Sequence, residues 1–470
     1  MIEPGWLALL PPVLAIVLAI VSRQVYLSLA AGVWLGWTML SGWNPGTGLA
    51  RAIDGVVDVV GDAGNAKVIL FTLVIGSLIR TLESSGGVRG FVHRLEEGRF
   101  VNNATRAQWL AWVVGLIIFI ESNITVLVAG SVSRPLFDRF RASREKLAYL
   151  IDSTSAPVCI LIPLNAWGAY NLSILTELGV EDPLGVFVRS IAFNFYAFFA
   201  VLLAALTILF KLDLGPMKRA EERTRNGELL WPNAQPMVSE DVTAPPATDR
   251  IPPRAINMIL PIVVMVTMMP VGLWITGGGR LQEGSGSTSV LWAVLTALAV
   301  SWIMLLAQRA FTVDQLMRIA LKGAGGLVPL ALILQLALAL GSVTTALGTG
   351  PYVASVTAGV LPPVLFLPLV FAVSAGIAFS TGTSWGTFAI MLPIAVPAAA
   401  TLGLPAAPFV AASLSGGVFG DHASPISDTT IIASMAAATD HIDHVRTQLP
   451  YALLAGAAAA VGFALVGATL

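Results

Sequence analysis

Charged side chains are scarce in this sequence of 470 residues: 11% are Asp, Glu, Lys or Arg, whereas 56% are hydrophobic. Soluble globular domains carry about 25% charged residues, so the composition excludes an ordinary soluble domain. Repeated apolar runs of about 20 residues favour a polytopic membrane protein instead. The net charge of −1 offers no basic excess of the kind that nucleic-acid binding requires.

Cysteine is almost missing as well. Cys159 is the one cysteine in the sequence, which excludes an intramolecular disulfide and argues against a cysteine-rich metal site. The amino-terminal stretch MIEPGWLALLPPVLAIVLAIV lacks a basic region and a small-residue cleavage site. It therefore predicts a retained first span rather than a cleaved signal peptide.

Apolar runs of sufficient length predict ten membrane spans. They are expected at 5–22, 25–43, 66–84, 147–171, 185–210, 255–276, 288–307, 323–345, 406–436 and 448–468. Two further apolar segments, 108–132 and 361–403, have polar midpoints, FIESNIT and FSTGTSWGT. The stretch 211–254 is polar, rich in proline and clustered in charge, which is typical of a linker.

The positions of Lys and Arg predict which loops face the cytoplasm. Segment 133–146 and the linker 211–254 are basic and are expected to be cytoplasmic, which leaves both termini outside. Because 85–107 is also basic, segment 108–132 would begin and end on one side of the membrane. That arrangement favours a re-entrant hairpin, buried in protein or lining a watery cavity. An ordinary spanning helix is the alternative.

The two halves of the chain are expected to be inverted repeats, 1–210 and 255–470, joined by the linker. Each would hold about five transmembrane helices, a re-entrant hairpin and a broken helix, a plan found in secondary transporters. A short echo supports the repeat: DSTSAP (152–157) and DHASP (421–425) each place an acid ahead of small polar residues and a proline. The predicted fold class is thus an all-α polytopic membrane protein.

An acidic, hydroxyl-rich motif, GDHASPISDTT (420–430), lies inside the predicted span 406–436. Pro425 predicts a break in that span, and a broken helix leaves carbonyl and amide groups available at its ends. Together with carboxylates and hydroxyls, these oxygens suit a small alkali cation. The candidate cation or proton ligands are Asp421, Asp428, Asp152, Ser424, Ser427, Thr429 and Thr430, with Na+ expected at Asp421, Ser424 and Asp428.

Lys and Arg are missing from the whole of 323–445, so Asp421 and Asp428 are not expected to have a permanent basic partner. An ionised aspartate at the bilayer centre costs about 3 kcal/mol on insertion scales. Such a carboxylate could exchange a proton for a sodium ion, since both occupy the same lone pairs. The structural alternative is that Asp421, Asp428 or Asp152 caps a half-helix.

Histidines near the motif leave several interpretations open. His422 could relay protons or sense pH, or it could be a core histidine with satisfied hydrogen bonds. DHIDH (440–444) could hold a transition metal, or it could begin a helix at the cytoplasmic interface as a pH-sensitive patch. Ser415, His422 and Asp428 could be drawn as a catalytic triad, but no nucleophile elbow exposes Ser415. No enzymatic activity is predicted.

The stretch 420–452, with STGTSWGTFAIMLPIA (380–395) and FIESNITVL (119–127), closely resembles the NhaC family of Na+/H+ antiporters. The resemblance implies a bacterial or archaeal inner-membrane transporter, usually a homodimer that moves its transport domain as an elevator. It also implies two cation sites at hairpin tips and helix breaks. One would use Ser122, Asn123 and 152–157, with Glu121 as a site acid or a hairpin-tip residue; the other would use Thr381, Thr383, Ser384 and 421–427.

The function that these observations favour is Na+/H+ antiport by alternating access at membrane-embedded carboxylates. The alternative is Na+- or H+-coupled transport of a small organic acid or amino acid, because hairpin tips and half-helix amino ends could hold a carboxylate without arginine. No cofactor is expected beyond the transported Na+ and H+. The expected partners are these ions, the lipid bilayer, a second copy of the chain and, under the alternative, the organic solute.

Overall fold

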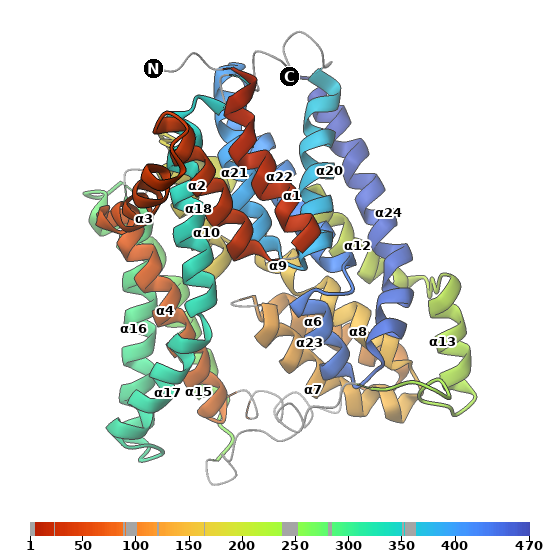
Figure 1. Ribbon diagram of the computed structural model, residues 1–470. Coiled ribbons are helices and arrows are strands. Elements are labelled where there is room, and N and C mark those ends of the chain that lie inside the picture. Colours follow the sequence, from red (N-terminus) through yellow and green to blue (C-terminus); the bar gives the residue numbers. More distant parts are fainter. Residues whose placement is uncertain are drawn as a thin grey trace.

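The computed structural model describes residues 5–22, 24–87, 90, 101–119, 122–163, 165–236, 252–280, 284–349, 352 and 363–470. Within these ranges the chain is helical, and no strand is present beyond the isolated bridge between Pro236 and Asp440. Seven described helices are long and apolar enough to cross a membrane, or eight if one bent pair counts as a single span. The predicted all-α polytopic class is confirmed (Figure 1).

The amino-terminal helices contain one element that hydropathy did not predict. A short 3-10 helix (Trp6–Leu9) leads into α1 (Leu10–Ser22), which is followed by α2 (Val25–Leu40), α3 (Pro45–Gly61) and α4 (Ala63–Ser84). Helix α3 is amphipathic, so it gives no long apolar run. It begins because the Asn44 side chain accepts hydrogen bonds from the amides of Gly46 and Thr47.

The predicted hairpin 108–132 corresponds to two packed helices, α6 (Ala104–Ile117) and α7 (Ser122–Phe140). Helix α6 has 14 residues, which reach only about 21 Å at 1.5 Å per residue, less than a hydrocarbon core of about 30 Å. Helix α6 alone therefore cannot cross the membrane. Re-entry of this pair into the bilayer stays a prediction.

The predicted span 147–171 is not one continuous helix. It is divided into α8 (Arg144–Ser153), α9 (Ala156–Cys159) and α10 (Ala166–Glu177). Pro157 is an early residue of α9, where its missing amide costs nothing, and the side chain of Asn165 caps α10. The chain then continues through α11 (Pro183–Ile191) and α12 (Phe195–Leu209).

The stretch predicted as a linker holds a helix, α13 (Gly215–Arg225), that packs against α8 and α24. Composition alone suggested an unstructured connection, but buried ion pairs hold this helix on the protein. Residues 237–251 of the predicted linker lie outside the described part of the chain.

The second half contains the remaining helices. They are α15 (Ile256–Thr276), α16 (Gly286–Ala307), α17 (Val313–Gly326), α18 (Val328–Ala346), α20 (Pro363–Thr381), α21 (Ser384–Thr401), α22 (Ala406–Ala423), α23 (Asp428–Ala437) and α24 (His441–Gly467). The break between α22 and α23 lies where Pro425 predicted it. Helices α20 and α21 occupy the predicted hairpin 361–403, and each is long enough to cross a membrane by itself, so re-entry of this pair also stays a prediction.

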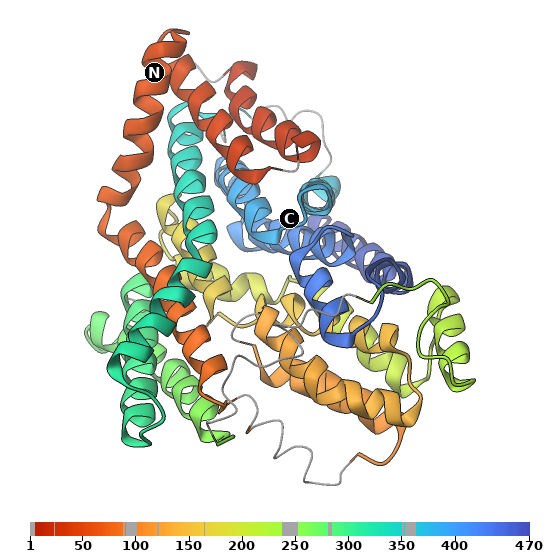
Figure 2. The same ribbon diagram turned by 60° about the horizontal axis from the view of Figure 1, so that its bottom comes forward.

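The helices gather into two groups that both views show side by side (Figures 1 and 2). Helices α4, α15, α16 and α17 pack together in one group, while α20–α24 pack with α6–α8 and α12 in the other. In Figure 1 the hairpin α20–α21 lies in the upper half of the molecule and α6–α7 in the lower half. The order of a hairpin followed by a broken helix thus occurs twice, while the inverted relation of the halves stays a prediction.

Candidate ion site at two helix breaks

Asp421 lies in the last turn of α22 and is 2% exposed. Its Oδ2 accepts hydrogen bonds from the backbone amide of Ser384, at 3.3 Å, and from the Ser384 hydroxyl. Ser384 is the first residue of α21, so the carboxylate lies at the positive end of that helix. Free amides and the helix dipole at this end stabilise an anion or a bound ion pair.

The turn of the second hairpin is packed directly against the break between α22 and α23. Ser424 donates from its hydroxyl to the Phe379 carbonyl at 2.7 Å. Gly382 has φ of +68°, and a Cβ there would lie 2.4 Å from the carbonyl oxygen of Ile426. Only glycine tolerates both the left-handed backbone and this close approach. The two segments that the resemblance grouped are therefore in contact.

Asp152 occupies the corresponding place in the first half, at the end of α8, and its side chain is buried. Its Oδ2 accepts from Gln448 Nε2 at 2.7 Å and from the Thr430 hydroxyl at 3.1 Å. The imidazole Nε2 atoms of His422 and His444 lie 3.9 Å and 4.0 Å from the same oxygen. Helices α22, α23 and α24 of the second half thus converge on an acid of the first half.

His422 connects the surroundings of the two acids. It follows Asp421 in the chain, and its Nε2 lies 3.3 Å from the Ser153 hydroxyl. Its Nδ1 lies 2.6 Å from the Tyr196 hydroxyl. Both ring nitrogens therefore have hydroxyl partners that can donate or accept, which suits either of the two roles suggested for this histidine.

Asn165, which was not predicted from the sequence, connects the first hairpin to the break between α9 and α10. Its Nδ2 donates to the carbonyls of Phe119, at 2.9 Å, and Cys159, at 2.7 Å. A Cβ on Gly115 would lie 2.0 Å from the Thr154 hydroxyl oxygen, so α6 also approaches this break closely. The Phe119 carbonyl is held here much as the Phe379 carbonyl is held in the second half.

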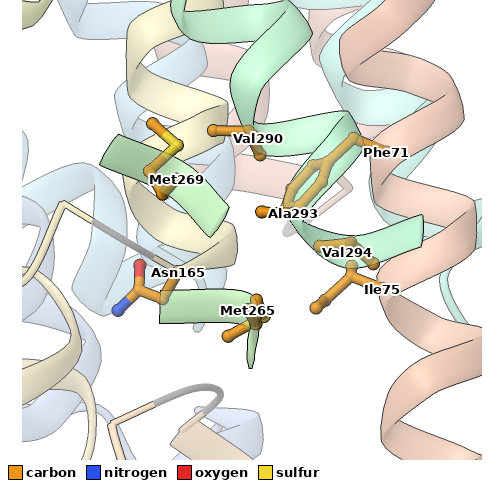
Figure 3. A pocket seen from close by; sticks show the side chains of 8 residues that line it. All are labelled: Phe71, Ile75, Asn165, Met265, Met269, Val290, Ala293 and Val294. Atoms are coloured by element: carbon orange, nitrogen blue, oxygen red, sulfur yellow. The ribbon is translucent and has the colours of Figure 1, made fainter. Parts of the chain in front are cut away.

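Asn165 also lines a small apolar pocket of about 10 Å³, whose other lining residues belong to α4, α15 and α16. Figure 3 shows it as the polar side chain among apolar ones from α4, α15 and α16. The other lining residues are Phe71, Ile75, Met265, Met269, Val290, Ala293 and Val294.

The remaining predicted site residues have varied positions. Ser427 caps α23, accepting from the Thr430 amide, and its hydroxyl lies 3.0 Å from that of Thr429. Thr381 donates to the Ile377 carbonyl, and Ser122 is buried at the start of α7. Thr383 directly precedes α21, and its side chain makes no capping hydrogen bond there. Asn123 lies in α7 and Asp428 begins α23, but their side chains are outside the described structure, as is the whole of Glu121.

Two short motifs with a possible chemical interpretation lie at the starts of helices. DHIDH begins α24, with Asp440 as the cap that accepts from the Ile442 and Asp443 amides, and the described residues contain no metal-binding group of three His, Cys, Asp or Glu. The pattern G-x-S-x-G does occur at 382–386, around Ser384. It joins two helices rather than a strand and a helix, so it is not a nucleophile elbow.

Charged contacts fix the opposite end of α8. Arg223 of α13 makes two hydrogen bonds to the buried carboxylate of Glu145, at 2.8 and 3.0 Å. Glu221 accepts from both the amide and the hydroxyl of Ser143, the cap of α8. Burial raises the pKa of Glu221, although the Ser143 hydrogen bonds oppose that rise. Helix α13 therefore holds the amino end of the helix that carries Asp152.

Buried carboxylates at helix breaks, in a chain with several apolar spans, define an integral membrane protein of the secondary transporter class. The sequence matches the Na+/H+ antiporter family over residues 167–468. The chain belongs to that family, as its resemblance to NhaC proteins implied.

Known relatives agree with the class. An uncharacterized protein of Haemophilus influenzae is 34% identical over 488 aligned residues, which cover 98% of this chain and 91% of that protein. The arginine/ornithine antiporter ArcD of Halobacterium salinarum is 30% identical, covering 44% of this chain and 41% of ArcD. The malate-2H(+)/Na(+)-lactate antiporter of Bacillus subtilis is 35% identical, covering 22% of each chain.

Solved membrane transporters share the fold at low sequence identity. The YdaH transporter of Alcanivorax borkumensis superposes with a TM-score of 0.57 at 13% identity, covering 90% of this chain and 88% of YdaH. MtrF of Neisseria gonorrhoeae gives 0.52 at 13% identity, covering 89% and 84%. At this identity the likeness concerns the fold alone.

Proposed function

We propose that the protein exchanges Na+ for protons across the membrane, with Asp421 and Asp152 as the acids that change occupancy. The observation that carries this proposal is the burial of both carboxylates at helix breaks, among neutral oxygen donors and histidines. Lysine and arginine are missing from 323–445, so no basic residue of that stretch competes with a cation at Asp421.

The surroundings of Asp421, at the break between α22 and α23, are proposed as the sodium site. Its carboxylate, the Ser384 hydroxyl and the Ser424 backbone lie at the meeting point of three helix ends. Sodium is a hard cation that prefers such oxygen ligands, and Asp428 at the start of α23 is proposed as a second acid. A proton on Asp421 occupies the lone pairs that sodium needs, so the two ions exclude each other.

The surroundings of Asp152, at the end of α8, are proposed as the proton site. Gln448 and Thr430 donate to its ionised form, and hydrogen bonds to a charged group are worth about 1.5–3 kcal/mol each. They offset part of the penalty for a carboxylate at membrane depth. His422 follows Asp421 in the chain, and its Nε2 lies 3.9 Å from Asp152 Oδ2, so it is proposed to carry protons between the two acids.

Alternating access is proposed to arise by movement of the helices that hold both acids, α6–α8 and α20–α24, against the group of α4, α15, α16 and α17. This elevator-like movement is supported by the separate apolar core that α4, α15 and α16 share, because helices with a core of their own can stay fixed while the others move. A homodimer in a bacterial or archaeal inner membrane, with α13 in the cytoplasm, completes the proposal.

Transport of an organic solute is the second candidate, and the relatives favour it. ArcD is named for arginine and ornithine, and the Bacillus subtilis relative for malate and lactate. The amino end of α21 could hold a substrate carboxylate in place of the Asp421 contact. Sodium or proton movement would then require the organic partner.

One reconstitution experiment separates the two candidates. Purified protein in liposomes with an internal pH dye receives a sodium gradient, first alone and then with a panel of organic acids and amino acids. Sodium/proton exchange predicts a pH change with sodium alone and no stimulation by any member of the panel. A pH change that requires an organic solute would replace the first proposal by the second.

A further inference from the structure

Two of the four histidines in the sequence face one serine hydroxyl. Nδ1 of His441 lies 3.0 Å from the Ser434 hydroxyl oxygen, and Nδ1 of His444 lies 2.9 Å from it. His444 is fully buried, His441 is half-buried, and Ser434 is in the last turns of α23. The arrangement links the start of α24 to the surroundings of Asp152.

The outer nitrogens of both rings must carry hydrogen. His441 Nε2 lies 2.6 Å from the Pro425 carbonyl, which can only accept. His444 Nε2 lies 2.9 Å from Gln448 Oε1, which also only accepts. The orientation of that amide is fixed, because its Nε2 lies 2.7 Å from the carbonyl oxygen of His422 and donates there.

The hydrogen bonds around Ser434 need at least one more proton than two neutral histidine rings supply. If both rings were neutral with hydrogen on Nε2, both Nδ1 atoms would present lone pairs to Ser434. A serine hydroxyl has one hydrogen, and the Thr430 carbonyl at 2.9 Å also competes for it. One Nδ1 would therefore face the oxygen without any hydrogen between them. All contacts are satisfied only when at least one of His441 and His444 carries a second proton.

The surroundings can balance this positive charge. Asp152 Oδ2 lies 4.0 Å from His444 Nε2, and Ser434 belongs to the carboxyl end of α23, where the helix dipole favours a cation. Asp440 and Asp443 flank His441 in the first turn of α24. The other charged or titratable groups on packed elements are Asp138 on α7, Arg144 and Glu145 on α8, Arg223 on α13, His422 on α22 and Arg446 on α24.

We infer that His441, Ser434 and His444 form a proton-binding site that stores one proton beyond the neutral state and passes it to Asp152. The proton reaches Nδ1 of His441 at the half-buried end. Ser434 accepts it while giving its own hydrogen to Nδ1 of His444. His444 then releases its Nε2 hydrogen toward Asp152 Oδ2, 4.0 Å away, and is left neutral with hydrogen on Nδ1 alone. Reorientation of the ring brings that nitrogen back to Gln448, which restores the starting arrangement before the next transfer. The storage follows from the contacts alone, whereas delivery to Asp152 rests on the proposed exchange function.

Magnetic resonance of the full-length protein in lipid bilayers tests the storage directly. With histidine labelled by ¹⁵N, spectra are recorded at pH 8, where a histidine of ordinary pKa near 6.5 is only about 3% charged. We expect one imidazolium signal, assigned by its loss or shift in H441Q and H444Q. Spectra in which all the histidines are neutral at pH 8 would overturn the inference.

Ser434→Ala is the second arm, because it removes the bridge and keeps both histidines. Without the shared oxygen, neither Nδ1 needs a hydrogen, so the imidazolium signal should disappear at pH 8. Persistence of the signal in a folded S434A protein would contradict the proton count. Thr447→Val, which alters a neighbouring hydroxyl bonded only to backbone carbonyls of its own helix, should leave the signal unchanged.

Transport measurements separate this inference from the proposed function. If wild-type liposomes show sodium/proton exchange, S434A should lower its rate about tenfold or more and displace its pH profile. Unchanged exchange in S434A would overturn delivery to Asp152. If wild-type protein shows the imidazolium but no exchange, the proposed function fails while the storage site stands.

Discussion

Removal of Arg223 should release α13 from the protein surface, because this arginine neutralises a buried acid. The Arg223 guanidinium is 4% exposed, and the Glu145 side chain that it contacts is 0% exposed. The two hydrogen bonds between them are 2.8 and 3.0 Å long. Arg223→Gln keeps some of the hydrogen-bonding capacity but leaves Glu145 with an uncompensated charge.

The expected loss follows from that burial. Breaking a buried ion pair by removing one partner costs about 3–5 kcal/mol, whereas exposed pairs contribute about 0–1 kcal/mol. A loss of 3 kcal/mol raises the population of the detached state more than about 100-fold, since each 1.4 kcal/mol is a factor of ten. The double variant E145Q/R223Q should recover much of this loss, because neither charge is then left alone.

Hydrogen exchange of the α13 amides measures this opening. R223Q should accelerate exchange across Gly215–Arg225 by about 100-fold or more. The matched control is Arg225→Gln, since Arg225 is 61% exposed and its contacts with acids are 3.7 and 4.0 Å long; it should change exchange less than about fivefold. Equal effects of the two single variants, or no recovery in the double variant, would refute the assignment of α13 to a buried charge contact.

Three further changes test the site and its support. Gly382→Ala should destabilise the protein more than Gly403→Ala in thermal unfolding. Both glycines have φ of +68°, but only at Gly382 would a Cβ lie against a backbone oxygen. Equal losses of stability in the two variants would contradict the close packing at the break. Ser384→Ala removes a hydrogen bond to a charged group, worth about 1.5–3 kcal/mol. The sodium concentration for half-maximal exchange should therefore rise about 10- to 100-fold. An unchanged concentration would exclude the Ser384 hydroxyl from the site. Glu221 has a raised pKa, so its protonated form favours the folded state. That contribution is lost as pH rises above about 4.5 through the raised pKa, so wild type should lose stability relative to Glu221→Gln over this window. A stability difference that stays constant with pH would show that Glu221 does not titrate with folding.

The break in α22 was predictable because its cause is local. Pro425 lacks an amide hydrogen and glycines precede it, so the local sequence is enough to indicate the helix break. The acids were predictable for a similar reason, since a carboxylate in an apolar run stands out against its surroundings. The structure adds that Asp421 is at the amino end of α21, a relation between helices that no single stretch of sequence contains.

Residues that serve the acids from other helices were not predicted. Gln448 and Tyr196 are single polar residues in apolar helices, where such residues also occur without any role in an ion site. Asn165 resembles an ordinary helix cap until its contacts with Phe119 and Cys159 are seen. Their roles depend on tertiary contacts rather than on spacing along the chain.

Helices α3 and α13 were missed for a different reason. Each is amphipathic, with its apolar residues on one side only, so neither gives a continuous apolar run. The buried ion pair between Arg223 and Glu145 joins positions 78 residues apart, which a local pattern cannot register. Composition therefore identified the apolar spans and under-represented the amphipathic elements.

Exchange by the Asp421→Asn variant is the most direct test of the account. Asparagine has nearly the same shape and can still accept from Ser384, but it cannot release a proton to make room for sodium. In liposomes with a pH dye, a sodium gradient should move protons in wild type and in the Asp314→Asn control, whose side chain is 74% exposed, and should move none in folded D421N protein. Full sodium-driven proton movement by D421N would contradict the central claim.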